Sequence, residues 1–150
     1  MLGKLARLSP ADWRGLGVAY IYLLWAGWRM FVRREKLDRW IAPAPRPAPK
    51  RPLTAAERKV ELRRAGIVNL AANRPRVWAR CLQRSLALCL WMERKGYQPE
   101  IKIGVIKEGG ELTAHAWVEY LGEVLNEDPE RLAAFTFLES APRNLAPRAR

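Results

Sequence analysis

A cysteine, a histidine and carboxylates, which together can carry out acyl-transfer chemistry, follow one another in that order along this chain. Cys81 begins an apolar stretch, His115 follows in a stretch that alternates apolar and polar residues, and acidic residues come after the histidine. A thiolate is the nucleophilic form of cysteine, an imidazole can take the thiol proton, and a carboxylate can orient that imidazole. The order predicts a nucleophilic cysteine site, with a structural histidine and a buried cysteine as the alternative.

The pattern of residues 76–96 predicts a helix that Cys81 opens. Leu82, Leu86 and Leu90 recur at four-residue spacing, and Gly96 is suited to end the helix. The partial positive charge of a helix N-terminus stabilises a thiolate. A cysteine that opens this helix is therefore favoured as a nucleophile.

The second cysteine, Cys89, is predicted to be a small core residue because leucines flank it on both sides. Eight helical residues separate the two cysteines by about 12 Å, which is too far for a disulfide. This usage favours a reducing compartment. Two cysteines and one histidine also lack the paired ligand spacing of a zinc site, so no metal is predicted.

His115 is predicted to lie on the middle strand of an antiparallel meander. Residues 102–106 and 112–120 alternate in polarity, and Gly109-Gly110 between them is typical of a hairpin turn. A short third strand is expected from Glu123 to about Asn126. One face of the middle strand is expected to face the core through Leu112, Ala114, Ala116 and Val118, and the other carries Thr113, His115, Trp117 and Glu119. A helix followed by this meander predicts an α+β fold.

The turn after the middle strand decides which carboxylate faces His115. A three-residue loop ending at Gly122 places Glu127 opposite the histidine but sets two glutamates face to face. A two-residue loop places Asp128 opposite instead, and it requires a positive φ at Leu121, which is costly. We favour Glu127 on the strain argument, with Asp128 as the alternative.

The N-terminal region is apolar from residue 15 to residue 32 except for Arg29, and basic residues follow it. The favoured interpretation is a long helix that packs on the body of the protein or on a partner; peripheral membrane contact and a membrane span are the alternatives. No small-residue cleavage site follows the stretch, which argues against a signal peptide.

Further boundaries follow from composition. Residues 1–41 form an apolar and basic helical region, and five prolines in residues 42–52 predict an extended linker. A capping box at Thr54–Glu57 opens a charged helix that is expected to run to about Arg64 within a domain over residues 53–140. Residues 131–150 are expected to form a core-packing helix and then a tail, disordered over residues 141–150.

The formal charge of +12 favours a polyanionic partner such as nucleic acid or an anionic membrane. The charge is uneven, however, because residues 96–130 carry eight acidic and two basic side chains. The sequence also has no helix-turn-helix, zinc or RNA-binding signature, so nucleic acid is not expected as a partner.

Two stretches carry a family resemblance: C-L-x-R-S-L-A-L around Cys81 and A-H-A-W-V-E around His115. Residues 76–130 closely resemble the transglutaminase-like cysteine protease of lasso-peptide biosynthesis, in the stand-alone form without a fused leader-binding domain. The resemblance implies a transglutaminase- or papain-like core, with the cysteine at the start of a helix packed on an antiparallel sheet, and an extra apolar N-terminal helix. It makes Cys81 the nucleophile and His115 the base.

The family's usual third residue is an aspartate twelve positions after the histidine, and here that position is Glu127. The departure keeps a carboxylate but lengthens it by one methylene, and Asp128 stays the alternative third member. The resemblance implies cleavage of a leader from a precursor peptide, without cofactor or metal. It implies as partners that precursor, a separate leader-recognition protein and the ATP-dependent lasso cyclase, in the cytoplasm or at its membrane.

Two rival functions stay open at this point. An acyltransferase or transglutaminase would use the same triad with a different acceptor. A basic membrane or nucleic-acid adaptor would use no enzyme chemistry, and replacing Cys81 would cost it nothing.

Overall fold

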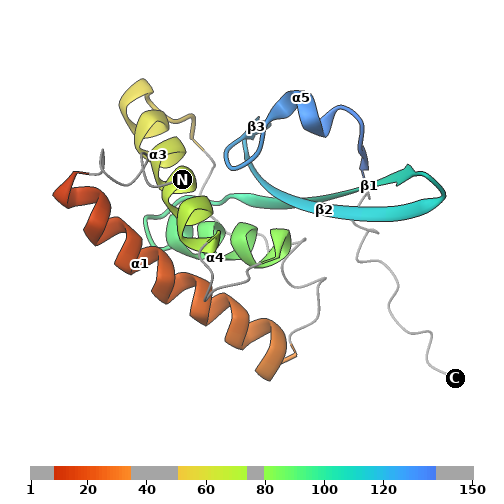
Figure 1. The fold of residues 1–150 in the computed structure, drawn as a ribbon. Helices are drawn as coiled ribbons and strands as arrows, with labels where there is room; N and C mark the ends of the chain where they lie inside the picture. The colour runs from red at the N-terminus through yellow and green to blue at the C-terminus, as the bar shows by residue number, and fades with distance from the viewer. Residues whose placement is uncertain (1–8, 35–50, 74–79, 138–150) are drawn as a thin grey trace, which may run out of the picture.

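The computed structural model describes residues 9–34, 51–73 and 80–137, and it shows the predicted α+β class (Figure 1). A four-stranded antiparallel sheet has the order β3-β2-β1-β4. The elements in chain order are α1 (Pro10–Gly27), the π-helical turn η2 (Trp28–Val32), α3 (Ala55–Ala72), α4 (Cys81–Glu93), β1 (Glu100–Glu108), β2 (Glu111–Tyr120), β3 (Glu123–Val124), α5 (Pro129–Leu132) and β4 (Thr136–Phe137). Most of the predicted linker and all of the predicted tail at 141–150 lie outside the described residues.

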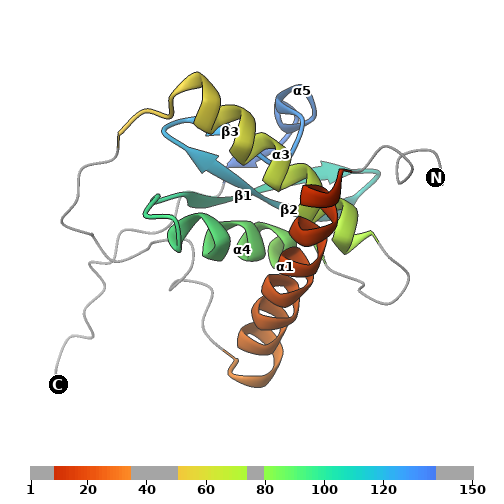
Figure 2. The ribbon, with the colours of Figure 1, turned by 90° about the vertical axis from the view of Figure 1, so that its left-hand side faces the viewer.

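The core lies between the three long helices and one face of the sheet. Figure 2 shows α4 alongside the β1–β2 hairpin, with α1 in front of α3 and α4. The buried side chains come from all of these elements, including Leu23 of α1, Val68 of α3, Leu88 of α4 and Val118 of β2. The apolar N-terminal helix therefore packs on the body of the protein, as the favoured interpretation expected.

Two helices begin at capping motifs that can be read in the sequence. Ser9 and Asp12 form a capping box at the start of α1, and the predicted box of Thr54 and Glu57 is present at the start of α3. The prediction that this helix ends near Arg64 was wrong. It continues to Ala72, because the small apolar residues of its later turns are buried against the core.

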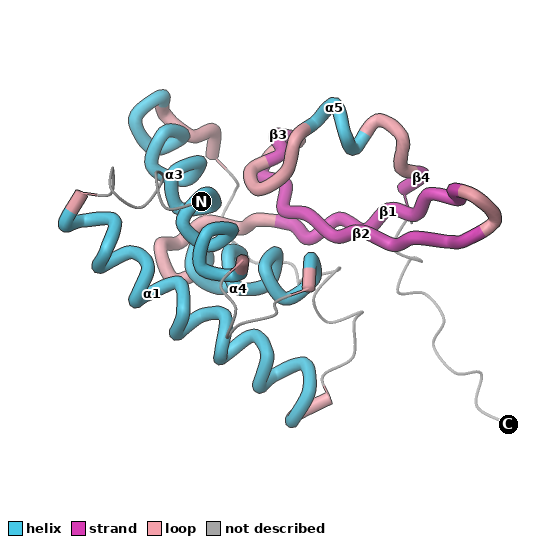
Figure 3. The backbone as a smooth tube through the Cα atoms, viewed as in Figure 1, coloured by secondary structure: helices cyan, strands magenta, loops and turns pink. Residues whose placement is uncertain are grey.

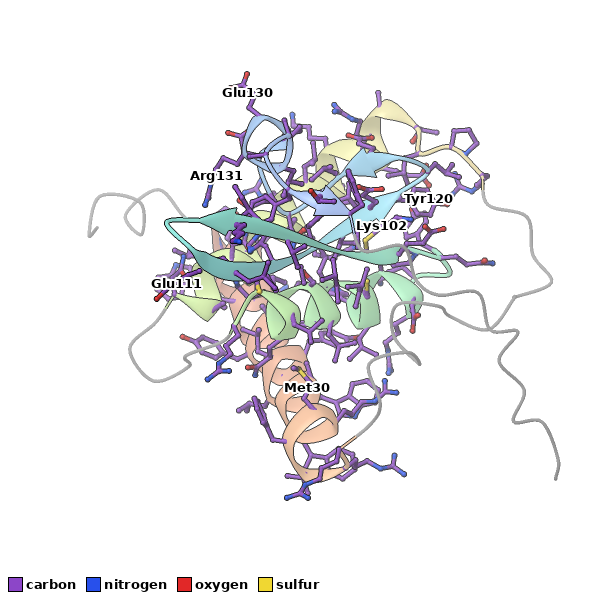
Figure 4. The ribbon with its side chains drawn as sticks, turned by 90° about the vertical axis from the view of Figure 1, so that its right-hand side faces the viewer. Met30, Lys102, Glu111, Tyr120, Glu130 and Arg131 are labelled. Carbon is purple, nitrogen blue, oxygen red and sulfur yellow. The ribbon has the colours of Figure 1, made fainter. Side chains whose placement is uncertain are left out.

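The β1–β2 hairpin turns at Gly109 and Gly110, whose φ angles are +59° and +90°, as expected for a two-glycine turn. Leu112 and Ala114 were expected to face the core, but both are exposed, Leu112 by 71%. The reason is that the hairpin extends beyond the start of α4. Figure 4 shows Glu111 at the outlying end of the hairpin and Tyr120 at the opposite end of β2.

The favoured loop between β2 and β3 was also wrong. Tyr120 pairs with Glu123, so the loop has two residues, and Leu121 has a φ of +51°. The register keeps two glutamates apart: Glu119 accepts a hydrogen bond from the indole of Trp117, and Glu123 pairs with Arg58. This register avoids a like-charge pair across the strands and accepts a positive φ at one leucine, a strain of order 1–2 kcal/mol.

The expected helix after residue 131 is replaced by the four-residue α5, which begins earlier, and by β4. Figure 3 shows this connection leaving β3 and returning to pair beside β1. Phe135 and Phe137 from the connection cover the face of the sheet that α4 does not cover, where Trp117 is fully buried. A run of aromatic residues near a short helix is used here to cover the second face of the sheet.

Candidate active site

His115 and Glu127 are in direct contact. The Nε2 atom of His115 lies 2.7 Å from Oε2 of Glu127, and each side chain is less than one-fifth exposed. A carboxylate only accepts hydrogen bonds, so the contact places the imidazole hydrogen on Nε2 when the ring is neutral. The lone pair of Nδ1 is then the basic atom of this histidine.

The contact is made although the strand register does not set it. The two-residue loop aligns His115 with Asp128, but β3 ends at Val124, and the chain leaves the sheet after one more backbone hydrogen bond, from Leu125 to Val118. Leaving the sheet frees the Glu127 side chain to reach the imidazole. Asp128, the alternative third residue, instead accepts a hydrogen bond from the N–H of Glu130 and caps α5.

The second oxygen of Glu127 is also occupied. Oε1 accepts hydrogen bonds from the N–H of Asp128 at 3.4 Å and from Nη1 of Arg131 at 3.3 Å. In Figure 4, Arg131 extends from α5 above the sheet. These donors leave Oε2 directed at His115, so the carboxylate has a defined orientation.

An aromatic wall holds the imidazole in place. The His115 ring lies 6.4 Å from the Trp117 ring, nearly parallel to it, and 5.6 Å from the Phe135 ring. Gly104, which pairs with His115 across the strands, makes room for both rings: a Cβ there would lie 2.9 Å from Cβ of Phe135 and 3.0 Å from the Trp117 indole. A glycine inside a strand is the sequence signal for such a close approach.

Two contacts fix how α4 lies on β2. The ring of Tyr97, just after the helix, packs edge-on against Tyr120 at the end of the strand, with centroids 5.7 Å apart. Earlier in the helix, the hydroxyl of Ser85 donates a hydrogen bond of 3.0 Å to the carbonyl of Ala116. The helix and the strand therefore run in the same direction.

This alignment brings the start of α4 to the level of the histidine. Cys81 is the first residue of α4 and lies one turn before Ser85, while His115 directly precedes Ala116. The thiol side chain is half-buried at the edge of the core. Cys81 and His115 therefore lie toward the same end of the contact between α4 and β2, and among the described residues the imidazole is hydrogen-bonded to Glu127 and not to the thiol.

A partly buried polar network joins the three elements that carry these residues. Asn126 accepts a hydrogen bond from the N–H of Val118, donates one to Ser85 Oγ, and accepts one at its carbonyl from Asn69 of α3. Ser85 is fully buried and passes the connection on to Ala116. One asparagine therefore connects the Glu127 loop to the histidine strand and to the cysteine helix.

No side chain among the described residues caps the N-terminus of α4. Its N-cap residue, Arg80, makes no side-chain capping hydrogen bond, and the first intrahelical bond runs from the N–H of Arg84 to the carbonyl of Arg80. The N–H groups of Cys81, Leu82 and Gln83 therefore have no acceptor within the helix. They form a partially positive end that can stabilise a thiolate or an oxyanion.

Cys89 is a different kind of cysteine, as predicted. It is buried in the core, and burial, with a smaller contribution from the nearby Glu93 charge, raises the pKa of its thiol well above the ordinary value. Among the described residues, no group of three His, Cys, Asp or Glu side chains is arranged to hold a metal ion.

Sequence reasoning missed Ser85, Asn126 and Gly104 as residues that build the site. The glycine had a usable signal, because it interrupts a strand pattern. Ser85 and Asn126 had none, since a serine in an apolar helix and an asparagine after a strand are ordinary surface residues until the fold brings them together.

Comparison with known proteins gives one match. The family model described as the transglutaminase-like superfamily matches residues 24–140, which contain Cys81, His115 and Glu127. Members of this superfamily are typically Cys-His-Asp/Glu proteases or acyltransferases. Searches of curated proteins and of solved structures returned no significant match.

Proposed function

Since the chain belongs to the transglutaminase-like superfamily, we propose that it is a cysteine peptidase that removes the leader from a ribosomally made lasso precursor peptide. The observation that carries the proposal is the 2.7 Å contact of His115 with Glu127, at the level of the helix start that bears Cys81. The resemblance of residues 76–130 to the lasso leader peptidase supplies the substrate.

In the proposed first step, Nδ1 of His115 takes the proton of the Cys81 thiol, and Glu127 stabilises the imidazolium through Nε2. The Cys81 thiolate attacks the carbonyl carbon of the bond between leader and core. The carbonyl oxygen becomes an oxyanion, which the N–H groups at the start of α4 can bind.

Collapse of this intermediate breaks the C–N bond and leaves the leader as a thioester on Cys81. The His115 imidazolium gives its proton to the departing amine, which is the new N-terminus of the core. Water, losing a proton to Nδ1, then attacks the thioester and releases the leader as a carboxylic acid with the free thiol. The freed amine is the group that ring closure by an ATP-dependent cyclase would require.

Product masses test this proposal and separate it from acyl transfer. The purified protein is incubated with a lasso precursor and a leader-recognition protein, and products are identified by mass spectrometry. Hydrolysis gives a leader acid and a free core whose masses sum to precursor plus one water. A new amide between the leader and an added amine would show acyl transfer instead.

Matched variants complete the test. Cys81→Ala should abolish product formation, whereas Cys89→Ala should retain it. If the protein forms neither product with any precursor, or if Cys81→Ala remains active, the cysteine peptidase proposal is wrong.

A further inference from the structure

The outer side of α1 and η2 carries exposed apolar side chains at Trp13 and from Ile21 to Val32. Seven large apolar side chains there are between 43% and 67% exposed. Most of them recur at three- or four-residue spacing, opposite the buried residues of the same helix. We call this surface the outer apolar face; it comprises Trp13, Ile21, Leu24, Trp25, Trp28, Phe31 and Val32.

The opposite side of the helix is held in the core. Asp12 pairs with Arg63 of α3 at 2.6 Å, and Gln83 of α4 donates a hydrogen bond of 2.9 Å to the carbonyl of Leu23. Gly27 permits this approach, because a Cβ there would lie 2.7 Å from Nε2 of Gln83. Pro10–Val32 is long and apolar enough to cross a membrane, but in this fold protein covers one side of it, so any lipid contact is one-sided.

The arrangement leaves the outer apolar face accessible. Figure 2 looks onto α1, and no other described element lies in front of it. Figure 4 shows Met30 on the part of the helix that extends past α4. A flat surface can therefore meet the helix along its length without displacing the body of the protein.

The residue types on and around this surface indicate what kind of partner binds it. Residues 13–34 contain four arginines and no acidic residue. Tryptophan, which supplies three of the seven apolar side chains, favours the boundary between lipid headgroups and hydrocarbon. One of the arginines, Arg33, stacks its guanidinium over the Trp28 ring at 5.3 Å, so positive charge is held beside the apolar surface.

From this combination we infer that the outer apolar face binds the surface of an anionic lipid bilayer, with α1 lying in the plane of the interface. Apolar side chains enter the headgroup boundary and the arginines meet negative headgroups. Because Gln83 lies two residues from Cys81 and contacts α1, the bound helix orients the start of α4 relative to the membrane.

Vesicle flotation of the full chain tests this inference. Phosphatidylcholine vesicles are compared with vesicles in which part of the lipid is phosphatidylglycerol. We expect the protein to float with the anionic vesicles at about 0.1 M salt and to bind at least tenfold less at about 0.5 M salt. Binding to phosphatidylcholine alone should also be at least tenfold weaker.

Two matched variants place the binding on α1. The double variant Leu24→Glu and Phe31→Glu puts charges on the outer apolar face, and we expect it to lose at least tenfold in binding to anionic vesicles. Val60→Glu makes the same kind of change at an exposed apolar residue of α3 and should bind like the parent. Circular dichroism checks that each variant is folded.

Several outcomes would overturn the inference. One is failure to bind anionic vesicles; another is equal binding to both lipids; a third is equal loss in the Val60→Glu control. Self-association that the α1 double variant abolishes, without vesicle binding, would instead assign the face to a second copy of the chain.

Discussion

The N-termini of α3 and α4 differ in which groups accept hydrogen bonds from their first backbone N–H groups. At α3, the Thr54 hydroxyl accepts the N–H of Glu57, whose carboxylate accepts the N–H of Thr54 at 2.9 Å. Arg51 also binds this carboxylate, and its guanidinium holds the pKa of Glu57 well below the usual range, with help from Thr54. At α4, Arg80 provides no side-chain cap.

The difference indicates that the N-terminus of α3 contributes to stability, whereas that of α4 lies at the candidate active site. A capped terminus stabilises the fold, and its N–H groups are already occupied. At α4, the first N–H groups, beside Cys81, have no acceptor within the helix and no capping side chain among the described residues. Along the same helix, Cys89 is buried among core residues and its thiol resists ionisation. The position on the helix, rather than the residue type, distinguishes the two cysteines.

The largest expected effect comes from replacing each of the two cysteines in turn. Cys81→Ala should lower the rate of precursor cleavage by about 10³-fold or more, because the variant lacks the thiol that forms the thioester intermediate. Cys89→Ala should keep the rate within about threefold and cost about 1 kcal/mol of stability through a small cavity. Cleavage assays and urea unfolding measure both. Loss of activity in Cys89→Ala alone would reverse the assignment.

The next largest effect compares neighbouring carboxylates. Glu127→Gln should slow cleavage about a hundredfold or more, because a neutral amide does not stabilise the imidazolium of His115. Asp128→Asn should change the rate little, since asparagine also caps a helix start. Steady-state kinetics of both isosteric variants decide between them. A fully active Glu127→Gln with an inactive Asp128→Asn would make Asp128 the third residue.

A smaller effect concerns the network that joins the three elements. Asn126→Ala should lower kcat by a factor about ten times larger than the factor by which it changes KM. It should also lower the free energy of unfolding by about 1–3 kcal/mol, because the Val118 N–H loses its acceptor and Ser85 Oγ loses a donor. Asn69→Ala removes a bond to the same loop but leaves these two intact, and it should retain more activity. Equal kinetic losses in the two variants would contradict this role for the Asn126 side chain.

The capped terminus should show the opposite behaviour. Thr54→Ala should cost about 1 kcal/mol in the free energy of unfolding, because it removes the acceptor of the Glu57 N–H. Cleavage at 25 °C should not change, since the cap lies outside the proposed site. Urea unfolding and a cleavage assay check the two halves of this prediction, and a catalytic loss in the folded variant would refute it.

The subtlest effect is the pH dependence of stability. Arg63, with Ser9, holds the pKa of Asp12 well below its usual range, as Arg51 does for Glu57. A carboxyl with a lowered pKa in the folded state contributes stability above its unfolded pKa of about 4, and loses it as the pH falls toward the folded value. Urea unfolding at pH 7 and pH 3 should show this loss, and it should be smaller in Asp12→Asn. An equal loss in that variant would contradict the assignment.

Much of the fold could be predicted from local patterns. The capping box at Thr54, the helix start at Cys81 and the turn at Gly109 depend on neighbouring residues, and the structure shows all three. The exposure of Leu112 depends on where another element stops, which local alternation does not report. The two-residue turn at Leu121 accompanies an ion pair of Glu123 with Arg58 of α3, a contact between distant residues that a local pattern does not report.

The site divides in the same way. The residue placed against His115 was anticipated as Glu127, but from a register that the structure does not have. The contact arises because the chain leaves the sheet after Leu125, an irregular step that no periodic pattern predicts. The links through Ser85 and Asn126 join residues 41 positions apart, and only the folded chain shows them.

The rate of alkylation at each cysteine tests the central claim, that Cys81, His115 and Glu127 act as one unit. Iodoacetamide labelling followed by peptide mass spectrometry gives both rates in one sample. At pH 7, Cys81 should react at least tenfold faster than Cys89. His115→Ala and Glu127→Gln should each slow Cys81, whereas Asp128→Asn should not. If Cys81 reacts at the same rate in the parent and in His115→Ala, the histidine does not activate the thiol and the triad is wrong.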